Sequence, residues 1–286
     1  MPGTQKHVAC PLCGGRDERA MTAYAKDHLV CCASCGFVHS ERIPAASELE
    51  AFYGRYPRTE AISPITLERY DEWLQRFGRW RSTGNIIDVG AGNGYFAERA
   101  KLNGWKSYAT EYEALAVAIC KSKGIETHQG GLDTAGYADG MFDVICSIEV
   151  VEHLSDPAAE IRQFNRILRK GGLVYVTTPN LRSLSHLYHG AKWSVFNYPE
   201  HLGYFTPRTL RSLFERNGFK LHSLRTTGIS ADRFFESRSE SPMVTDEHIR
   251  RRIEGNPLGR VAKKVANTLL DLSKRGDTIK AEFVKV

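Results

Sequence analysis

The chain has 286 residues, of which 42% are hydrophobic and 25% are charged. This is the composition of a globular protein, and the length is enough for one sizeable domain with a smaller one. No run of apolar residues approaches the roughly 18 needed for a membrane-spanning helix, and the first residues lack the apolar core of a signal peptide, so we expect a cytoplasmic protein without a membrane span. The net charge of +6 does not by itself indicate a nucleic-acid partner.

The sequence predicts three parts. Residues 1–40 are rich in cysteine and show little helical periodicity, which is typical of a small metal-binding module. Residues 41–83 favour a helical connector or lid with helices over 46–53 and 67–80. In residues 84–286, strands and helices alternate, the pattern of parallel βαβ units in a doubly wound α/β sheet.

The elements of this third part are predicted in chain order from apolar runs and helical spacing. The strands are expected at 86–89, 107–110, 125–128, 142–147, 173–178, 219–225 and 279–286, and the helices at 95–102, 114–123, 157–168 and 207–217. Asp156 and Thr206 are expected N-caps, because each precedes a proline at the first helical position.

A polar insertion is predicted at about residues 230–275, between the last two strands. Apolar residues recur in it at helical spacing from 258 to 272. We expect this stripe to pack on the domain, while the basic runs at 250–252 and 263–264 stay solvated, because charge runs usually do.

Four cysteines form two C-x-x-C-G knuckles, Cys10 with Cys13 and Cys32 with Cys35. Each knuckle turns the backbone so that two thiolates converge, and four thiolates complete a tetrahedral Zn²⁺ site. A segment of about 40 residues buries too little surface to fold alone, so the metal would be structural. Cys31 could replace Cys32 but lacks the two-residue spacing, and the alternative to zinc is four buried thiols. The two cysteines outside the module, Cys120 and Cys146, are expected to be buried and inert.

A glycine loop follows the strand at 86–89, with glycines at Gly90, Gly92 and Gly94. Glycines let a ligand approach the backbone at the carboxyl edge of the sheet, but this spacing differs from the dinucleotide fingerprint G-x-G-x-x-G. Asp88 would repel a pyrophosphate and suits a ligand with an ammonium group. Glu111 ends the next strand, where it can accept both ribose hydroxyls, so a nucleoside with an amino-acid tail fits better than NAD.

The segment from Asp88 to Gly94 resembles the first motif of the class I S-adenosylmethionine-dependent methyltransferases, and Glu111 matches their second-strand acid. Residues 139–145 and 168–173 are similar to the family's start of the fourth strand and turn into the fifth. The resemblance covers residues 85–225. It implies a Rossmann-like seven-stranded sheet of order 3-2-1-4-5-7-6 with an antiparallel last strand. It also implies S-adenosylmethionine as cofactor and S-adenosylhomocysteine as product.

The resemblance also implies the rest of the cofactor site. The acid that the family commonly places near the adenine falls on Gly131, so the backbone of Leu132 is expected to take its role. Ser147, at the end of the fourth strand, is a further expected cofactor contact.

The transferred methyl group is already activated by the sulfonium, so such an enzyme mainly aligns the nucleophile, and a hydroxyl or carbon acid also needs a base. His153, in the Glu-His-Leu turn after the fourth strand, is one candidate base, with a structural role as the alternative. A second candidate lies in the loop of about 27 residues after the fifth strand, which is too long for a plain connection.

Tyr198, Glu200 and His201 in this loop resemble a set found in zinc-containing sugar C-methyltransferases, which act on nucleotide-linked keto-sugars and carry an N-terminal zinc module. The resemblance implies His201 as the base, oriented by Glu200, with Tyr198 contacting the substrate. The alternative is that His201 caps the helix begun at Thr206.

The sequence favours a methyltransferase acting on a small molecule, namely a sugar or related metabolite of natural-product or surface-glycan biosynthesis, either free or nucleotide-linked. The first alternative is an rRNA or tRNA methyltransferase whose zinc module grips RNA. It is disfavoured because residues 1–40 hold nearly equal numbers of basic and acidic side chains. A non-enzymatic zinc interaction module is disfavoured by the intact glycine loop.

Overall fold

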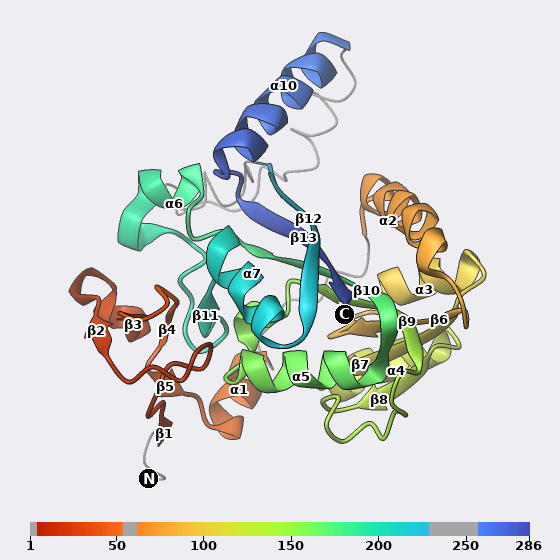
Figure 1. Cartoon of the computed structure of the whole chain (residues 1–286), viewed down its shortest axis with the longest axis horizontal. Helices are drawn as coiled ribbons and strands as arrows, with labels where there is room; N and C mark the ends of the chain where they lie inside the picture. The colour runs from red at the N-terminus through yellow and green to blue at the C-terminus, as the bar shows by residue number, and fades with distance from the viewer. Residues whose placement is uncertain (1–4, 54–61, 229–256) are drawn as a thin grey trace.

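The computed structural model describes residues 5–53, 62–228 and 257–286, and a seven-stranded sheet forms its centre (Figure 1). The strand order is β12-β13-β10-β9-β6-β7-β8, which is the predicted order 3-2-1-4-5-7-6. β13 runs antiparallel to β10 and β12, and the pairs from β10 to β8 are parallel. The predicted doubly wound fold is therefore confirmed. The strands are β6 (Asn85–Val89), β7 (Lys106–Glu111), β8 (Glu126–Gln129), β9 (Phe142–Ile148), β10 (Leu168–Pro179), β12 (Phe219–Thr227) and β13 (Thr278–Lys285).

Helices cover both faces of this sheet. On one face lie α2 (Pro64–Phe77), α3 (Tyr95–Leu102) and α4 (Ala114–Ser122), which bury apolar side chains against β6, β7, β9 and β10. On the other face α5 (Pro157–Ile167) and α7 (Pro207–Arg216) pack on a cluster that includes Phe164, Phe214 and Phe283. Each of these helices has apolar residues at helical spacing along one face. Burying that apolar face against the sheet is the helix's main source of stability, so the spacing determines where the helix packs.

The boundaries follow local signals in the sequence. Asp156 accepts a hydrogen bond from the Ala159 amide at 2.8 Å, and Thr206 accepts one from the Thr209 amide at 3.1 Å, so both predicted N-caps are present. β10 begins at Leu168, five residues earlier than predicted, because an irregularity between Leu168 and Leu173 lets the strand continue through the glycine turn.

The cysteine-rich segment forms a second sheet of order β11-β4-β3-β2. Its strands are β2 (Glu18–Ala20), β3 (Leu29–Cys32), β4 (Val38–Ser40) and β11 (Gly203–Tyr204). β1 (Gln5–Lys6) pairs with β5 (Arg42–Ile43), and α1 (Ala46–Tyr53) follows. β11 belongs to the long loop after β10, which also carries α6 (Leu184–His189). The cysteine module is therefore joined by main-chain hydrogen bonds to the loop that holds His201.

The predicted packing of the stripe at 258–272 is wrong for the side chains that the structure describes. It does form a helix, α10 (Pro257–Ser273), but Val265, Leu269 and Leu272 are 55%, 61% and 76% exposed, and Leu270 is buried. α10 meets β12 at its last turns, where the Thr226 hydroxyl donates to the Leu270 carbonyl, and Figure 1 shows the rest projecting from the sheet. The basic run at 250–252 lies outside the described residues, and Lys264 is exposed. None of the helices in the described ranges is long and apolar enough to cross a membrane.

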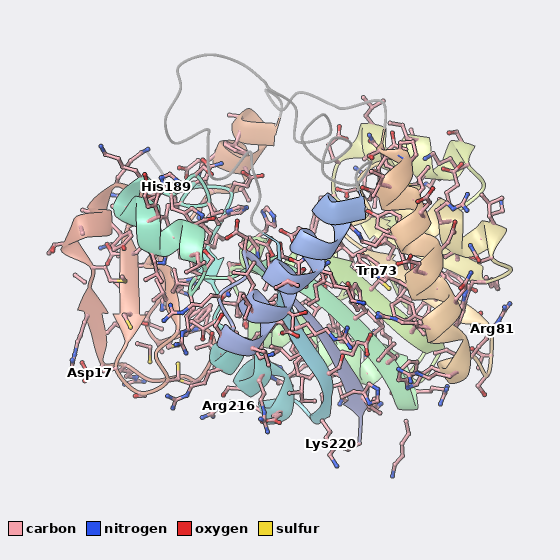
Figure 2. All side chains as sticks on the ribbon, turned by 90° about the horizontal axis from the view of Figure 1, so that it is seen from above. Asp17, Trp73, Arg81, His189, Arg216 and Lys220 are labelled. Atoms are coloured by element: carbon pink, nitrogen blue, oxygen red, sulfur yellow. The ribbon has the colours of Figure 1, made fainter. Side chains whose placement is uncertain are left out.

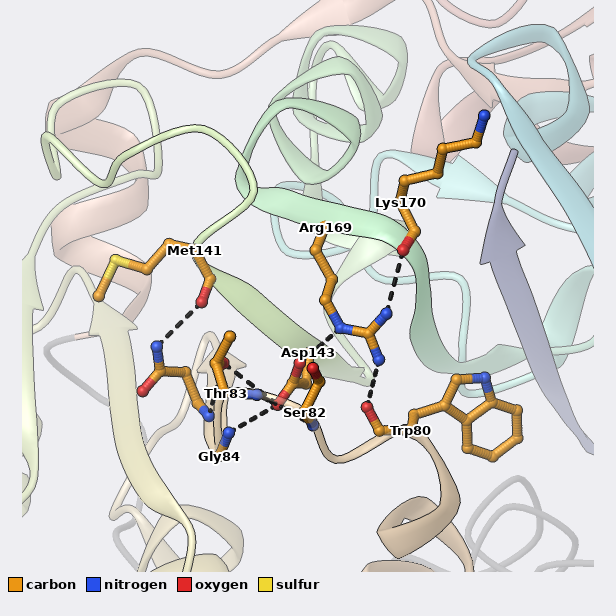
Figure 3. A network of polar contacts seen from close by, with 9 residues as sticks. Trp80, Ser82, Thr83, Gly84, Met141, Asp143, Arg169 and Lys170 are labelled. Atoms are coloured by element: carbon orange, nitrogen blue, oxygen red, sulfur yellow. Dashed lines mark hydrogen bonds and ion pairs between the residues drawn. The ribbon is translucent and has the colours of Figure 1, made fainter.

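A buried carboxylate ties the connector to the sheet at the start of β9 (Figure 3). Asp143 is fully buried, and its Oδ2 accepts hydrogen bonds from the backbone amides of Ser82, Thr83 and Gly84 at 2.7–2.8 Å. Its Oδ1 pairs with Arg169 Nε at 2.6 Å, and the same guanidinium reaches the Trp80 carbonyl. Burial alone would raise the pKa of Asp143, but these hydrogen bonds outweigh it and lower the pKa.

We expect Asp143→Asn to lower the free energy of unfolding by about 3–5 kcal/mol, the usual result of breaking a buried ion pair. Because the folded-state pKa is lowered, this contribution is present above the ordinary value of 3.8 and disappears as pH falls through the folded-state pKa. Urea denaturation across pH measures it. Asp139→Asn is the control: Asp139 pairs with Arg166 but is 81% exposed, so a change below about 1 kcal/mol is expected. Equal stability of the two variants at pH 7 would contradict the role of Asp143.

Candidate active site

In the glycine loop between β6 and α3, neighbouring side chains pack closely against Gly90 and Gly94 but not against Gly92. A Cβ at Gly90 would lie 2.7 Å from Val150 Cγ2, and a Cβ at Gly94 would lie 2.7 Å from Cys120 Sγ. At Gly92, where φ is +52°, no described atom lies within 4 Å of a Cβ position. A ligand can therefore approach the backbone closely at Gly92, whereas the flanking glycines are needed for packing.

Two acidic side chains lie at this loop, as the sequence suggested. Glu111, at the end of β7, accepts a hydrogen bond from the Gly92 amide at 2.8 Å through Oε2 and one from the Tyr112 amide at 2.8 Å through Oε1. Asp88 is 4% exposed, and its burial, together with the charge of Glu111, raises its pKa to about 8. Two carboxyl groups around one loop favour a positively charged ligand there.

The loop after β8 supplies an acid that the sequence analysis missed. A Cβ at Gly131 would lie 2.6 Å from both Asp133 Oδ1 and the Tyr112 hydroxyl, so these two groups flank the position to which counting assigned the adenine acid. Leu132 is fully buried, and the expected contact between its backbone and the cofactor stays a prediction. Counting residues from the fourth strand points to position 131 in the sequence. The turn at residues 131–134 folds the chain back, so that the Asp133 carboxylate lies beside Gly131. An acid two residues beyond Gly131 was the signal that could have revealed it.

Ser147 borders the same loop from β9. It is buried opposite Val89 in the parallel register, and its hydroxyl has no hydrogen-bond partner within the described part of the chain. A buried hydroxyl normally finds a partner, so this one is available to a ligand. Cys120 and Cys146 are fully buried, as predicted.

His153 and His201, the two candidate bases, lie side by side. Their ring centroids are 4.8 Å apart. His153 Nδ1 lies 3.0 Å from the Glu200 carbonyl oxygen, and His201 Nδ1 lies 2.7 Å from the Val195 carbonyl oxygen. A carbonyl only accepts hydrogen bonds, so each Nδ1 carries a proton and each neutral ring keeps its lone pair at Nε2.

Glu152 completes this histidine cluster. It is 2% exposed, and its Oε2 accepts a hydrogen bond from the Thr178 hydroxyl at 2.9 Å. Its Oε1 lies 4.0 Å from His153 Nε2, and Glu152, His153 and His201 each place one ligand atom within 4.8 Å of the others. Sequence reasoning did not assign Glu152 a role, although it directly precedes His153.

The electrostatics of the histidine cluster keep it uncharged near neutral pH. Burial, followed by the charge of Glu149, raises the pKa of Glu152 to about 8. Burial lowers the pKa of both imidazoles below the ordinary value of 6.5. Neutral imidazoles with bare Nε2 atoms are proton acceptors, as a general base requires.

Two predictions about His201 are wrong. Glu200 does not orient it, because the Glu200 carboxylate accepts a hydrogen bond from Asn197 Nδ2 at 2.7 Å and the Val195 carbonyl holds the imidazole. Residues 198–200 form a turn, which is closed by the hydrogen bond from the His201 amide to the Asn197 carbonyl at 2.9 Å, and the Glu200 carboxylate is held at Asn197 within it. Nor does His201 cap α7, since the Thr206 hydroxyl does so.

Tyr198 points toward the cysteine module and α1. Its hydroxyl donates to Glu48 Oε2 at 3.3 Å, and its ring meets the edge of His28 at a centroid distance of 5.1 Å. The structure thus separates Tyr198 from the histidine cluster, and its contact with a substrate stays a prediction.

The four cysteines of the two knuckles converge in the N-terminal module. Their Sγ atoms lie within 4.8 Å of one another, with Cys10–Cys35 at 3.7 Å and Cys13–Cys32 at 3.6 Å. Four sulfurs at 2.3 Å from a tetrahedral zinc ion would be about 3.8 Å apart, so the spacing fits that ion. The Cys31 Sγ lies outside this group, near the Cys32 carbonyl oxygen.

The comparisons with known proteins agree with this geometry. The sequence model of a methyltransferase domain matches residues 58–224, more than half of the chain. The chain belongs to this methyltransferase domain family. A probable S-adenosylmethionine-dependent methyltransferase of Mycobacterium tuberculosis is 32% identical over 121 residues, which are 42% of this chain and 44% of that protein. A ubiquinone biosynthesis O-methyltransferase of Sodalis glossinidius is 30% identical over 134 residues, 44% of this chain and 52% of that protein.

The chain spans about half the length of these curated relatives. Among solved structures, an S-adenosylmethionine-dependent methyltransferase from Archaeoglobus fulgidus superposes with a TM-score of 0.52 at 18% identity, covering 77% of this chain and 94% of that one. A geranyl diphosphate C-methyltransferase from Streptomyces coelicolor gives 0.53 at 15% identity, covering 77% and 79%. At these identities the superpositions show a shared fold.

Proposed function

We propose that this protein binds S-adenosylmethionine at the edge of β6, β7 and β9 and transfers its methyl group to a small molecule. The family membership and the paired acids at the glycine loop support the proposal. The cofactor carries a sulfonium and an ammonium group, and these positive charges would lower the raised pKa of Asp88 and favour its ionised form beside Glu111. Glu111 would hold the ribose, and Asp133 or the Leu132 backbone would meet the adenine.

We expect Glu111→Gln to weaken binding of S-adenosylhomocysteine about 10- to 100-fold, because one arm of a charge-assisted bidentate contact is lost. Isothermal titration calorimetry measures it. Glu126→Gln, on the neighbouring strand β8 and exposed, serves as control and should bind normally. Unchanged affinity in Glu111→Gln, or tight binding of NAD to the wild type, would contradict the cofactor site.

The acceptor in this proposal is a hydroxyl or carbon acid of a sugar or related metabolite, either free or nucleotide-linked. The observation that carries it is the bare Nε2 of His201 beside buried Glu152, at the carboxyl edge of β9 and β10. An acceptor that is already a good nucleophile would not need such a base. The similarity of the loop from 198 to 201 to that of sugar methyltransferases favours a sugar-like molecule.

Bound S-adenosylmethionine supplies the activated methyl group. In the proposed reaction His201 Nε2 accepts the acceptor's proton, and the Val195 carbonyl keeps the imidazole in the tautomer that can do so. Glu152, which the Thr178 hydroxyl holds in place, lies beside the resulting imidazolium, whose charge lowers the pKa of Glu152 and so favours its ionised form. His153, fixed by the Glu200 carbonyl, forms one wall of the cluster.

Replacing His201 tests the base. We expect His201→Ala and His201→Asn to lower the single-turnover rate about 10²–10⁴-fold with cofactor affinity retained, the usual range for loss of a general base. His201→Asn is the sharper variant, because its amide can still donate to Val195 while the basic nitrogen is gone. Normal turnover in His201→Asn would assign His201 a structural role and leave His153 as the base.

The acceptor for that measurement comes from a screen for transfer of labelled methyl from S-adenosylmethionine to sugars, nucleotide-sugars and bulk RNA. Labelling of small molecules alone supports the proposal. Salt-sensitive labelling of RNA alone would overturn it in favour of the rRNA or tRNA alternative.

We also propose that Cys10, Cys13, Cys32 and Cys35 hold one structural Zn²⁺. The spacing of their sulfur atoms supports it, and no ligand position would be left open for catalysis. The module is joined to the His201 loop, since the Ser40 amide donates to the Leu202 carbonyl at 2.8 Å and Gly203 pairs with His39. The zinc would therefore also stabilise the position of His201.

We expect near-stoichiometric zinc in the purified protein and a large loss of metal in Cys13→Ser, accompanied by a lower melting temperature, because metal binding contributes to folding. Elemental analysis and thermal unfolding measure both. Cys31→Ser, one residue from a ligand but outside the cluster, should keep its zinc. Full zinc content in a Cys10→Ser/Cys13→Ser double variant would contradict the site.

A further inference from the structure

A cavity of about 350 Å³ lies between α2 and the strands β10, β12 and β13, apart from the histidine cluster and the glycine loop. Its basic lining residues are Arg76, Arg79, Arg225 and Lys280. Glu282 is the one acidic residue of the described lining, and it already accepts hydrogen bonds from Arg76 at 2.9 Å and Ser223 at 3.0 Å. The cavity therefore carries an excess of positive charge.

The strand register sets two of these cations against each other. Lys280 on β13 lies directly opposite Arg225 on β12. Directly opposite residues of an antiparallel pair present their side chains on one face about 5 Å apart, and like charges there are destabilising. Both side chains line the cavity, and Lys280 Nζ lies over the Trp73 ring at 5.7 Å from its centroid, so a bound anion would meet two cations there.

The floor of the cavity holds an unused hydrogen-bond donor. Tyr175 on β10 is 2% exposed, and its hydroxyl has no partner among the residues that the structure describes. Buried hydroxyl groups are nearly always hydrogen-bonded, so this one indicates a missing ligand or water. Trp73 forms the α2 side of the cavity, next to Tyr175 at a centroid distance of 4.7 Å (Figure 2).

We propose that this basic cavity binds the phosphate or diphosphate group of a small molecule. Guanidinium groups match phosphate oxygens in planar, paired hydrogen bonds, and a phenolic hydroxyl adds a donor from below. A nucleic acid strand is disfavoured, because such strands track along extended basic grooves, whereas these charges line one small cavity with a buried tyrosine.

Thr177 on β10 links the cavity to the carboxyl edge of the sheet. Thr177 lies opposite Lys280 in the register, and its hydroxyl donates to Glu149 Oε1 at 2.9 Å. A phosphorylated molecule held at Lys280 would therefore reach toward the carboxyl edge of β10. The anion site itself does not depend on which acceptor is methylated, so it can be tested without one.

Calorimetry of the full chain with inorganic pyrophosphate at low ionic strength tests the site. We expect Arg225→Ala/Lys280→Ala to weaken pyrophosphate binding at least tenfold and Tyr175→Phe to weaken it about tenfold, the usual effect of losing hydrogen bonds to a charged group. The double variant should keep a cooperative thermal unfolding transition, which shows that any loss of binding does not come from loss of the fold. Lys220→Ala, an exposed position near the amino end of β12 and outside the cavity, is the matched control and should bind normally (Figure 2).

A parallel titration with uridine diphosphate shows how far the ligand extends. Affinity equal to that of pyrophosphate supports a site for the anion alone, and tighter binding supports a ligand whose base also contacts the Trp73 wall. The proposal is overturned if the wild type does not bind millimolar pyrophosphate, or if the double variant and Tyr175→Phe bind it as tightly as the wild type. It is also overturned if an RNA oligonucleotide binds tightly and is lost in the double variant while pyrophosphate does not compete with it.

Discussion

The hydrogen bonds between β11 and β4 connect the two regions whose chemistry matters most in this chain. On one side of the pair lies the cysteine module, and on the other lies the segment that ends in His201 and Leu202. The Leu202 amide also donates to the Glu152 carbonyl at 2.7 Å, so the same segment is fixed to the turn after β9. A long loop would otherwise sample many conformations, and these bonds remove that freedom.

The packing around this pair has the same effect. Phe37 follows the second cysteine knuckle and contacts Phe205 at a centroid distance of 4.9 Å, and both rings are fully buried in the main hydrophobic cluster. The cysteine module therefore shares a core with the sheet. Phe37 and β4 are therefore the contacts through which the cysteine module packs against the segment that holds His201.

Acidic and basic side chains lie in different regions of the sheet. Carboxyl groups gather at the carboxyl ends of β6, β7 and β9, where Asp88, Glu111 and Glu152 lie, and the pKa values of Asp88 and Glu152 are raised by burial. Basic groups gather on the α2 face of β12 and β13, with Lys280 and Arg225 adjacent. A cation is favoured at the first place and an anion at the second, so one molecule of each charge can be held close to the same edge.

Local signals in the sequence determined the class of the fold and the glycine loop. The caps at Asp156 and Thr206, the glycine loop from Gly90 to Gly94 and the C-x-x-C spacing act within a few residues, so their structural outcome is fixed by neighbours in the chain. Tertiary structure decided what depends on distant segments. The partner of His201 is the Val195 carbonyl rather than Glu200, because a turn, not sequence distance, sets which groups face each other. Asp133 reaches Gly131 through such a turn, and α10 leaves most of its described apolar positions exposed because it extends past the sheet. The opposition of Lys280 and Arg225 arises only from the pairing of two strands more than fifty residues apart in the chain, which no local pattern encodes.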